Sequence, residues 1–194
     1  MKKIFYGIAA IAFLVSCDSK STNQVTMNED GDIVISEQSY KALREIQEEY
    51  KTCRENEESK SDCKNFTTKA VATFYELKDE ELMKDGEYIN YTALPELVAS
   101  SDNWELIGNA EDQSTLNKAQ TAADKGTAVI AFVEGKKGGH VSMIIPGEMR
   151  KSGKWDLLCP NSTGFFRHKV ESYIDKQLSY SFRSPDDVVV YKHK

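Results

Sequence analysis

The spacing of apolar residues changes from helical to strand-like at about residue 126. Before that point, apolar positions recur every three or four residues, as on one face of an α-helix. The first such stripe consists of Tyr40, Leu43, Ile46, Tyr50 and Cys53. Ser36 precedes the stripe and is a suitable N-cap, so the pattern predicts an amphipathic helix over residues 37–55.

Three further helices are indicated in this half of the chain. Asp62 is the expected N-cap of the second helix. The buried face of that helix would carry Cys63, Phe66, Ala70, Phe74 and Leu77. Residues 92–99 predict a short helix with Pro95 in its first turn, and residues 113–125 predict a longer helix that ends at Gly126.

After Gly126 the sequence consists of short β-rich runs separated by Gly, Pro and Lys clusters. Including one earlier candidate, the expected strands are residues 104–107, 127–133, 141–145, 155–159 and 188–191. Helices followed by strands are typical of an α+β protein. We therefore expect N-terminal helices packed on a C-terminal antiparallel β-sheet, with the Cys63 helix against that sheet.

The N-terminus has the pattern of an export signal. Two lysines precede an apolar run over residues 4–15 that is too short to span a bilayer. The run ends in Leu14-Val15-Ser16-Cys17, which resembles the bacterial lipobox, in which the cysteine is lipidated and becomes the mature N-terminus. We predict a lipoprotein signal peptide over residues 1–16 and lipidation at Cys17; an ordinary signal peptide with a chance cysteine is the alternative.

The residues after the signal divide into a polar segment and one domain. Residues 17–32 contain almost no apolar side chains and are expected to be a flexible tether. Residues 33–194 are then a single folded domain, of a size that supports one hydrophobic core. This organisation predicts a protein held by lipid at a bacterial membrane, in the periplasm or at the cell surface. We expect a monomer.

The charge balance excludes some function classes. The chain has 25 basic and 31 acidic residues, a formal charge of −6. Removal of residues 1–16 takes away two lysines and no acids, which leaves 23 basic residues and a charge of −8. Nucleic acid is therefore not an expected partner, because phosphate backbones require clustered cations.

No cofactor is indicated by the sequence. The three histidines, His140, His168 and His193, lack metal-ligand spacing, and no glycine-rich phosphate loop precedes a helix. We expect neither a metal nor another cofactor.

Cys63 and His140 are the candidate reactive residues. A thiol at a helix N-terminus is favoured as thiolate by the helix dipole and the unpaired N–H groups. His140 follows two glycines at the start of an apolar strand, where its imidazole can exchange a proton with a thiol on a neighbouring helix. Together these residues predict acyl transfer by a cysteine nucleophile. A surface imidazole in a glycine turn is the alternative interpretation of His140.

The cysteine count leaves the state of Cys63 open. If Cys17 is lipidated, Cys53, Cys63 and Cys159 remain, and an odd number leaves at least one unpaired. A disulfide of Cys53 with Cys63 or with Cys159 is an alternative to three thiols. The first of these two disulfides would remove the nucleophile.

Strand register suggests the residue that orients the histidine. If residues 146–154 form the hairpin loop, residue 146 faces 155 and cross-strand partners have numbers that sum to about 301, which places His140 opposite Asn161. Asp156 would instead face Ile145. An Asn oxygen can accept a hydrogen bond from an imidazole N–H without adding a buried charge. We therefore prefer Asn161 to Asp156.

These motifs resemble the cysteine and histidine blocks of the CHAP and NlpC/P60 families of papain-like peptidoglycan hydrolases. The resemblance rests on Cys63-Lys64-Asn65-Phe66, on the apolar run after Gly126 and on Gly139-His140-Val141-Ser142-Met143-Ile144, and it covers about residues 60–165. It implies a papain-like fold with Cys63 as nucleophile, His140 as base and Asn161 as orienting residue.

The resemblance also implies a substrate, the amide bonds of cell-wall peptidoglycan peptides. The sequence departs from the families at two places: Lys64 and Asn65 replace the usual Ser-Gly, and Cys159 lies where CHAP members often carry Glu. The expected function is a membrane-anchored cysteine amidase or endopeptidase. The alternative is a non-catalytic papain-like lipoprotein that acts as a binding or immunity module.

Overall fold

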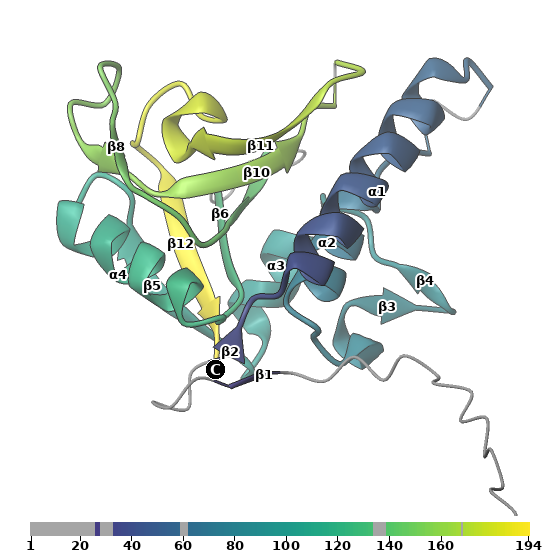
Figure 1. Ribbon diagram of the computed structural model, residues 1–194, viewed down its shortest axis with the longest axis horizontal. Coiled ribbons are helices and arrows are strands. Elements are labelled where there is room, and N and C mark those ends of the chain that lie inside the picture. The colour runs from purple at the N-terminus through teal and green to yellow at the C-terminus, as the bar shows by residue number, and fades with distance from the viewer. Residues whose placement is uncertain (1–25, 28–32, 59–61, 134–138, 168) are drawn as a thin grey trace, which may run out of the picture.

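The fold was analysed in a computed structural model that describes residues 26–27, 33–58, 62–133, 139–167 and 169–194 (Figure 1). The helices are α1 (Glu37–Glu55), α2 (Phe66–Phe74), α3 (Leu94–Ser100), α4 (Gln113–Asp124) and the 3-10 turns η1 (Asp79–Glu81) and η2 (Leu178–Tyr180). The strands are β1 (Thr26–Met27), β2 (Ile33–Val34), β3 (Met83–Lys84), β4 (Glu87–Tyr88), β5 (Trp104–Asn109), β6 (Val129–Val133), β7 (Val141–Ile144), β8 (Arg150–Lys151), β9 (Leu158–Cys159), β10 (Asn161–Phe165), β11 (Ser172–Gln177) and β12 (Val188–His193).

The largest sheet has six strands in the order β11-β10-β7-β6-β12-β5, and neighbouring strands in it run antiparallel. Helices α1, α2 and α3 lie on one side of this sheet and α4 lies on the other, as Figure 1 shows. The predicted α+β class, with N-terminal helices packed on an antiparallel sheet, is confirmed. No helix in the described part of the chain is both long and apolar enough to cross a bilayer.

The two faces of the sheet belong to two separate cores. Along β6, Ile130 and Phe132 contribute to the core shared with α1, α2 and α3, whereas Val129 and Ala131 contribute to the core beneath α4. This division follows from the two-residue repeat of a strand. Both faces are covered, so β6 is an apolar run instead of an alternating one.

The helix predictions hold where a cap defines the helix end. Helix α1 covers the predicted residues, and the Ser36 hydroxyl accepts a hydrogen bond from the Ser39 N–H at 3.1 Å. Helix α4 ends just before Gly126, whose φ of 77° favours glycine. Helix α3 has Pro95 in its first turn, as expected.

The predicted start of the second helix is wrong. Its N-cap is Asn65, and Asp62 lies in the preceding turn. The Lys64 N–H donates to the Asp62 carbonyl at 2.7 Å, and the Lys64 carbonyl accepts from the Tyr91 N–H at 2.8 Å. These bonds hold Cys63 in a turn three residues before the first residue of α2. The dipole of α2 acts more weakly there, because the effect falls off within the first helical turn.

The strand prediction over residues 155–159 is only partly confirmed. Just Leu158–Cys159 is extended, and it pairs with Arg150–Lys151 in a small ladder apart from the main sheet. The sheet strands β10 and β11 were not predicted.

The prediction of a flexible tether over residues 17–32 differs from the structure at one place, because Thr26–Met27 forms a strand that pairs with Ile33–Val34. The predicted signal peptide and Cys17 lie outside the described residues.

The register of β10 against β7 corrects the predicted orienting residue. Observed partners are Ser162 with Ile144 and Gly164 with Ser142, so partner numbers sum to 306. The difference arises because residues 146–160 contain the β8–β9 ladder and do not form a simple hairpin loop. When this register is continued beyond the paired residues, His140 faces Phe166, whereas Asn161 lies at the other end of β7.

Candidate functional site

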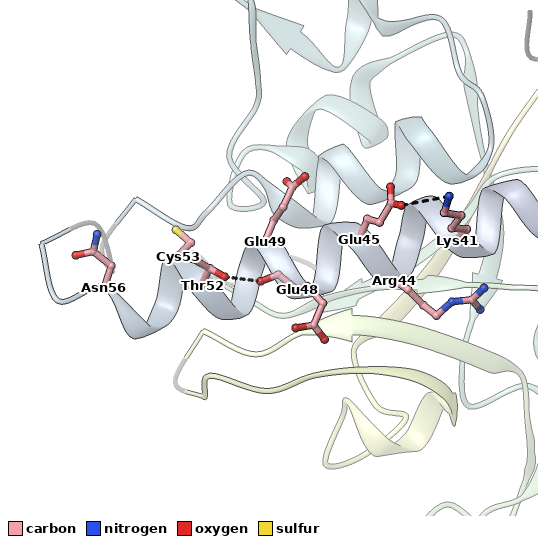
Figure 2. Close-up of a pocket in the computed structure, with 8 residues that line it drawn as sticks. All are labelled: Lys41, Arg44, Glu45, Glu48, Glu49, Thr52, Cys53 and Asn56. Carbon is pink, nitrogen blue, oxygen red and sulfur yellow. Dashed lines mark hydrogen bonds and ion pairs between the residues drawn. The ribbon is translucent and has the colours of Figure 1, made fainter. Parts of the chain in front are cut away.

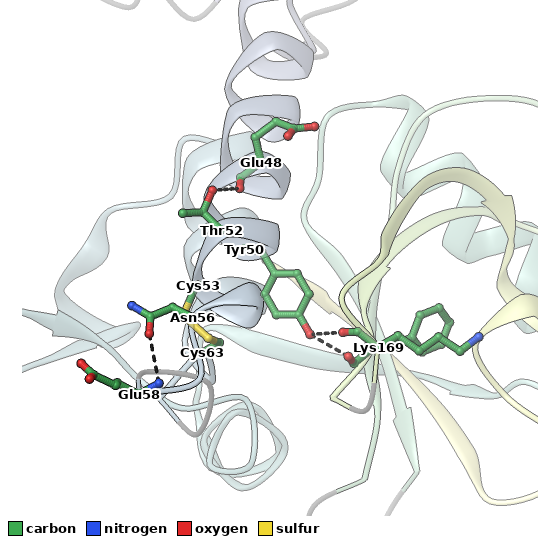
Figure 3. The surroundings of a disulfide bond; sticks show 9 residues. Glu48, Tyr50, Thr52, Cys53, Asn56, Glu58, Cys63 and Lys169 are labelled. Atoms are coloured by element: carbon green, nitrogen blue, oxygen red, sulfur yellow. Dashed lines mark hydrogen bonds between the residues drawn. A yellow bond between two sulfur atoms is a disulfide. The ribbon is translucent and has the colours of Figure 1, made fainter.

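Cys63 is joined to Cys53 by a disulfide bond, which Figure 3 shows at the end of α1. The two residues are ten apart in the chain, with their Cα atoms 6.0 Å apart. This is the first of the two pairings that the sequence left open. A sulfur in a disulfide is not a thiolate, so the prediction of Cys63 as a free nucleophile is wrong for this oxidised form.

Cys159 is the free cysteine among the described residues. Its side chain is buried beneath α4, and burial raises the pKa of its thiol. A buried cysteine of this kind acts as a small apolar side chain and not as a reactive group.

Two neighbouring cavities connect the regions of Cys63 and His140. Cys63 lines a cavity of ≈ 390 Å³, and His140 lines a second cavity of ≈ 260 Å³. Four residues line both cavities: Thr67, Tyr91, Phe165 and Arg167. We call the two cavities together the rim groove. The fold thus places two residues that are far apart in the chain at two cavities that share part of their lining.

The His140 imidazole is held by aromatic rings. It stacks on Phe166 with ring centres 5.1 Å apart and planes 12° apart, and it meets the edge of Phe182 at 5.5 Å. Its Nε2 atom is buried and forms no hydrogen bond with any described residue. Burial lowers the pKa of His140 from 6.5 to about 4, so the imidazole is neutral at pH 7.

The rings around His140 are themselves fixed by hydroxyl groups. Tyr173, whose ring contacts Phe166, shares hydrogen bonds with Ser142 at 3.0 Å and with Ser181. On the other side, the Tyr50 hydroxyl donates to the Phe166 carbonyl at 2.6 Å (Figure 3). These contacts couple α1 to the end of β10.

Asn161 does not orient His140. Its Nδ2 donates to the Pro146 carbonyl at 3.0 Å, and its Oδ1 accepts from Arg150 Nη2 at 2.8 Å. Its backbone N–H donates to Gln120 Oε1 at 2.7 Å. The first two bonds use both ends of the side-chain amide to fix the loop after β7, so the predicted catalytic role of Asn161 is wrong.

Asp156 does not take that role either. It lies in a turn with φ 57°, and its exposed carboxylate pairs with Lys151 Nζ at 2.6 Å. The hydrogen bond from Lys151 lowers the pKa of Asp156. The residues that orient the imidazole are Phe166 and Phe182, which sequence reasoning missed as site residues. The correct register would have placed Phe166 opposite His140.

A larger cavity of ≈ 800 Å³ lies along α1 and is drawn in Figure 2. Its lining consists of Lys41, Arg44, Glu45, Glu48, Glu49, Thr52, Cys53 and Asn56. These residues come from one helix and its C-cap, and several already pair with one another, such as Lys41 with Glu45 at 3.8 Å. An open helix surface with paired charges carries no candidate chemistry.

Within the described residues, no group of three or more His, Cys, Asp or Glu side chains is placed to hold a metal ion. Comparison with family models, with curated proteins and with solved structures finds no match for this chain.

Proposed function

We propose that the protein, once its Cys53–Cys63 disulfide is reduced, is a papain-like cysteine amidase or endopeptidase that acts on peptidoglycan peptides. Cys63 is the nucleophile and His140 the base. The observation that carries the proposal is that Cys63 and His140 line the two cavities of the rim groove, and that these cavities have four lining residues in common. The buried Nε2 of His140 has no hydrogen-bond partner among the described residues, and His140 lines the groove, so this atom can bond to a reacting group there.

The reduction requires a dithiol reductant. One of its thiolates attacks a sulfur of the Cys53–Cys63 bond, and its second thiol resolves the mixed disulfide. The reductant is oxidised to a disulfide, and two electrons and two protons give two cysteine thiols. The S–S bond that joins α1 to the turn before α2 is then broken, and Cys63 becomes available.

The hydrolytic steps use a neutral imidazole. His140 is uncharged at pH 7 because of its lowered pKa, so it can accept the Cys63 proton. The thiolate then attacks the amide carbon, and the imidazolium returns the proton to the leaving amine, which leaves a thioester on Cys63. Water activated by His140 cleaves the thioester, releases a carboxylic acid and restores the thiol.

Aromatic contacts provide the orientation that the resemblance assigned to Asn161. Stacking on Phe166 fixes the plane of the imidazole, and the edge of Phe182 limits its rotation. Burial among these rings also lowers the pKa of His140. The proposed site is thus a Cys-His pair whose imidazole is positioned by aromatic rings.

The test compares oxidised and dithiol-reduced protein on purified peptidoglycan and measures new amino groups. We expect activity only after reduction, and none for Cys63→Ala under either condition. Cys53→Ser should be active without reductant, because it leaves Cys63 free. Cys159→Ser, which changes a cysteine outside the groove, should behave as wild type. Equal amino-group release by wild type and Cys63→Ala, or none from the reduced wild type and Cys53→Ser, would exclude the mechanism.

The alternative function is a non-catalytic binding module that uses the same groove. It is favoured by one observation, the disulfide at Cys63. For such a module, oxidised and reduced protein would bind peptidoglycan fragments equally and cleave none of them.

Location at a membrane is also part of the proposal. Lipidation of Cys17 would hold the domain in the periplasm or at the cell surface. We expect Cys17→Ala to move the protein from the membrane fraction to the soluble fraction, without change in the activity of the reduced domain.

A further inference from the structure

The charge of the rim groove is opposite to that of the chain. The chain carries six more acidic than basic residues. The groove is lined by four cations and one acid. The cations are Arg54, Lys64, Arg167 and Lys169, and the acid is Glu57. A local surplus of positive charge in an acidic protein concentrates anions at that place.

Two of these cations have no anionic partner in the described part of the chain. Lys64, which is half-buried, and Arg167, which is exposed, form no ion pair with any residue that the structure describes. Basic residues elsewhere commonly do pair, for example Lys69 with Glu49, and Arg150 with Asp175 at 3.1 Å. Lys64 and Arg167 are therefore available to an incoming anion.

Their positions flank both proposed reactive groups. Lys64 follows Cys63 in the chain and lines the same cavity. Arg167 lines both cavities. Lys169 Nζ lies 4.9 Å from the centre of the Phe166 ring, which is stacked on His140. An anion bound by these residues would therefore lie in the groove, close to Cys63 and His140.

The geometry points to a substrate class: we propose that the groove selects peptides with a free carboxylate close to the scissile amide. This inference rests on the proposed function. Arg167 is the main specificity residue, because a guanidinium binds a carboxylate through two parallel hydrogen bonds. Lys64 adds a second positive charge. Tyr91 and Phe165, which line both cavities, supply apolar contact for the peptide stem.

A short peptide fits this groove better than a polymer does. The cavity beside Cys63 has a volume of ≈ 390 Å³, which is the size of a site for a small ligand. The cations are few, and the acidic remainder of the chain repels a long polyanion. A peptide of a few residues with a single carboxylate fits both the volume of the cavity and the small number of cations.

The test uses the Cys53→Ser protein, which needs no reductant, and two peptides that differ only in one group. One peptide carries a free carboxylate next to the scissile amide, and the other carries a carboxamide. We expect kcat/KM to be about tenfold higher for the carboxylate peptide. Arg167→Gln should remove this preference, and Lys64→Gln should reduce it. Arg167→Lys should retain part of the preference, because lysine keeps the positive charge but cannot form the two parallel hydrogen bonds of a guanidinium.

Lys176→Gln is the matched control, because Lys176 is an exposed lysine on β11 away from the groove. It should keep the full preference. Circular dichroism and thermal melts will show that each variant is folded. If the two peptides react equally, or if Arg167→Gln slows both by the same factor, the proposed specificity is wrong.

A binding assay separates failure of this inference from failure of the proposed function. The Cys53→Ser/Cys63→Ala protein cannot form a thioester, yet its groove keeps the cations. Tighter binding of the carboxylate peptide to this protein, measured by calorimetry and lost in its Arg167→Gln variant, supports the specificity even if no variant cleaves either peptide. Equal binding of both peptides would overturn it.

Discussion

The two ends of strand β7 differ in how their polar groups are satisfied. At the Ile145 end, Gln120 Nε2 donates to the Ile145 carbonyl at 3.1 Å, and Asn161 bonds to Pro146, Arg150 and Gln120. The polar side chains at this end are thus joined to loop and helix in one connected network. At the His140 end, Nε2 of the imidazole is buried without a described partner.

This difference separates a structural site from a candidate reactive site. A connected network of satisfied amides holds a loop and has no capacity left for a ligand. A buried nitrogen that has no partner among the described residues, and that lies next to a cavity lined by Arg167, has that capacity. The residue type did not distinguish the two ends, since both offered a polar side chain suited to catalysis. The two ends are distinguished by whether the polar side chain has hydrogen-bond partners among the described residues.

The largest expected effect concerns catalysis at the His140 end. In the Cys53→Ser background, His140→Ala should lower kcat about 10²–10⁴-fold, because the proton of Cys63 loses its acceptor. Hydrolysis of a defined stem peptide measures this. Asn161→Ala is the matched variant and should leave kcat within about twofold, provided that the assay temperature is below its melting point. Loss of activity in a folded Asn161→Ala protein would instead support the predicted catalytic triad of Cys63, His140 and Asn161.

The next effect concerns stability at the Ile145 end. Asn161→Ala removes the bonds to Pro146 and Arg150 and leaves the Tyr40 hydroxyl, at 3.2 Å, as a donor to the Pro146 carbonyl. We expect the free energy of unfolding to fall by about 2–3 kcal/mol. Urea unfolding with an unchanged m-value measures it. A loss below about 0.5 kcal/mol would show that the network does not hold the loop.

A smaller effect is the pH dependence that His140 gives to stability. Its folded-state pKa of about 4 lies below the ordinary 6.5. The unfolded chain therefore binds more protons than the folded chain between these values, and stability falls as the pH decreases from about 6.5 to 4. Between pH 7 and pH 4.5 we expect wild type to lose on the order of 2 kcal/mol more than His140→Phe. Parallel losses in the two proteins would contradict the burial of the imidazole.

The smallest effect is expected on the α1 surface in Figure 2. Lys41 and Glu45 form an exposed i,i+4 pair, with side chains 62% and 63% exposed. Lys41→Gln should change the free energy of unfolding by less than about 0.5 kcal/mol and leave peptide binding unchanged. A large loss of peptide binding would place the ligand site on α1 and not in the rim groove.

Elements with local signals were predictable from the sequence. The apolar stripe and the Ser36 cap define α1, and the glycine at position 126 ends α4. The switch to β-rich runs indicated the antiparallel sheet. In each of these elements, nearby residues supply both the pattern and its end, so no distant contact is needed to interpret it.

Features that depend on distant contacts were not predictable. The β8–β9 ladder changed the register, and with it the neighbour of His140 from Asn161 to Phe166. Cysteine spacing allowed two disulfides and does not select between them. The start of α2 also depended on such a contact, because the carbonyl of Lys64 accepts a hydrogen bond from the distant Tyr91 N–H.

The most direct test of the central claim is to trap the thioester on Cys63. Cys53→Ser protein is mixed with a slow-reacting stem peptide, quenched in acid and digested, and the fragment that contains Cys63 is weighed by mass spectrometry. We predict an added acyl mass on Cys63 that appears before the amine product reaches its steady rate, and that is absent from Cys53→Ser/Cys63→Ala. Amine release with no acyl mass on Cys63, or no reaction by a folded protein, would contradict the account.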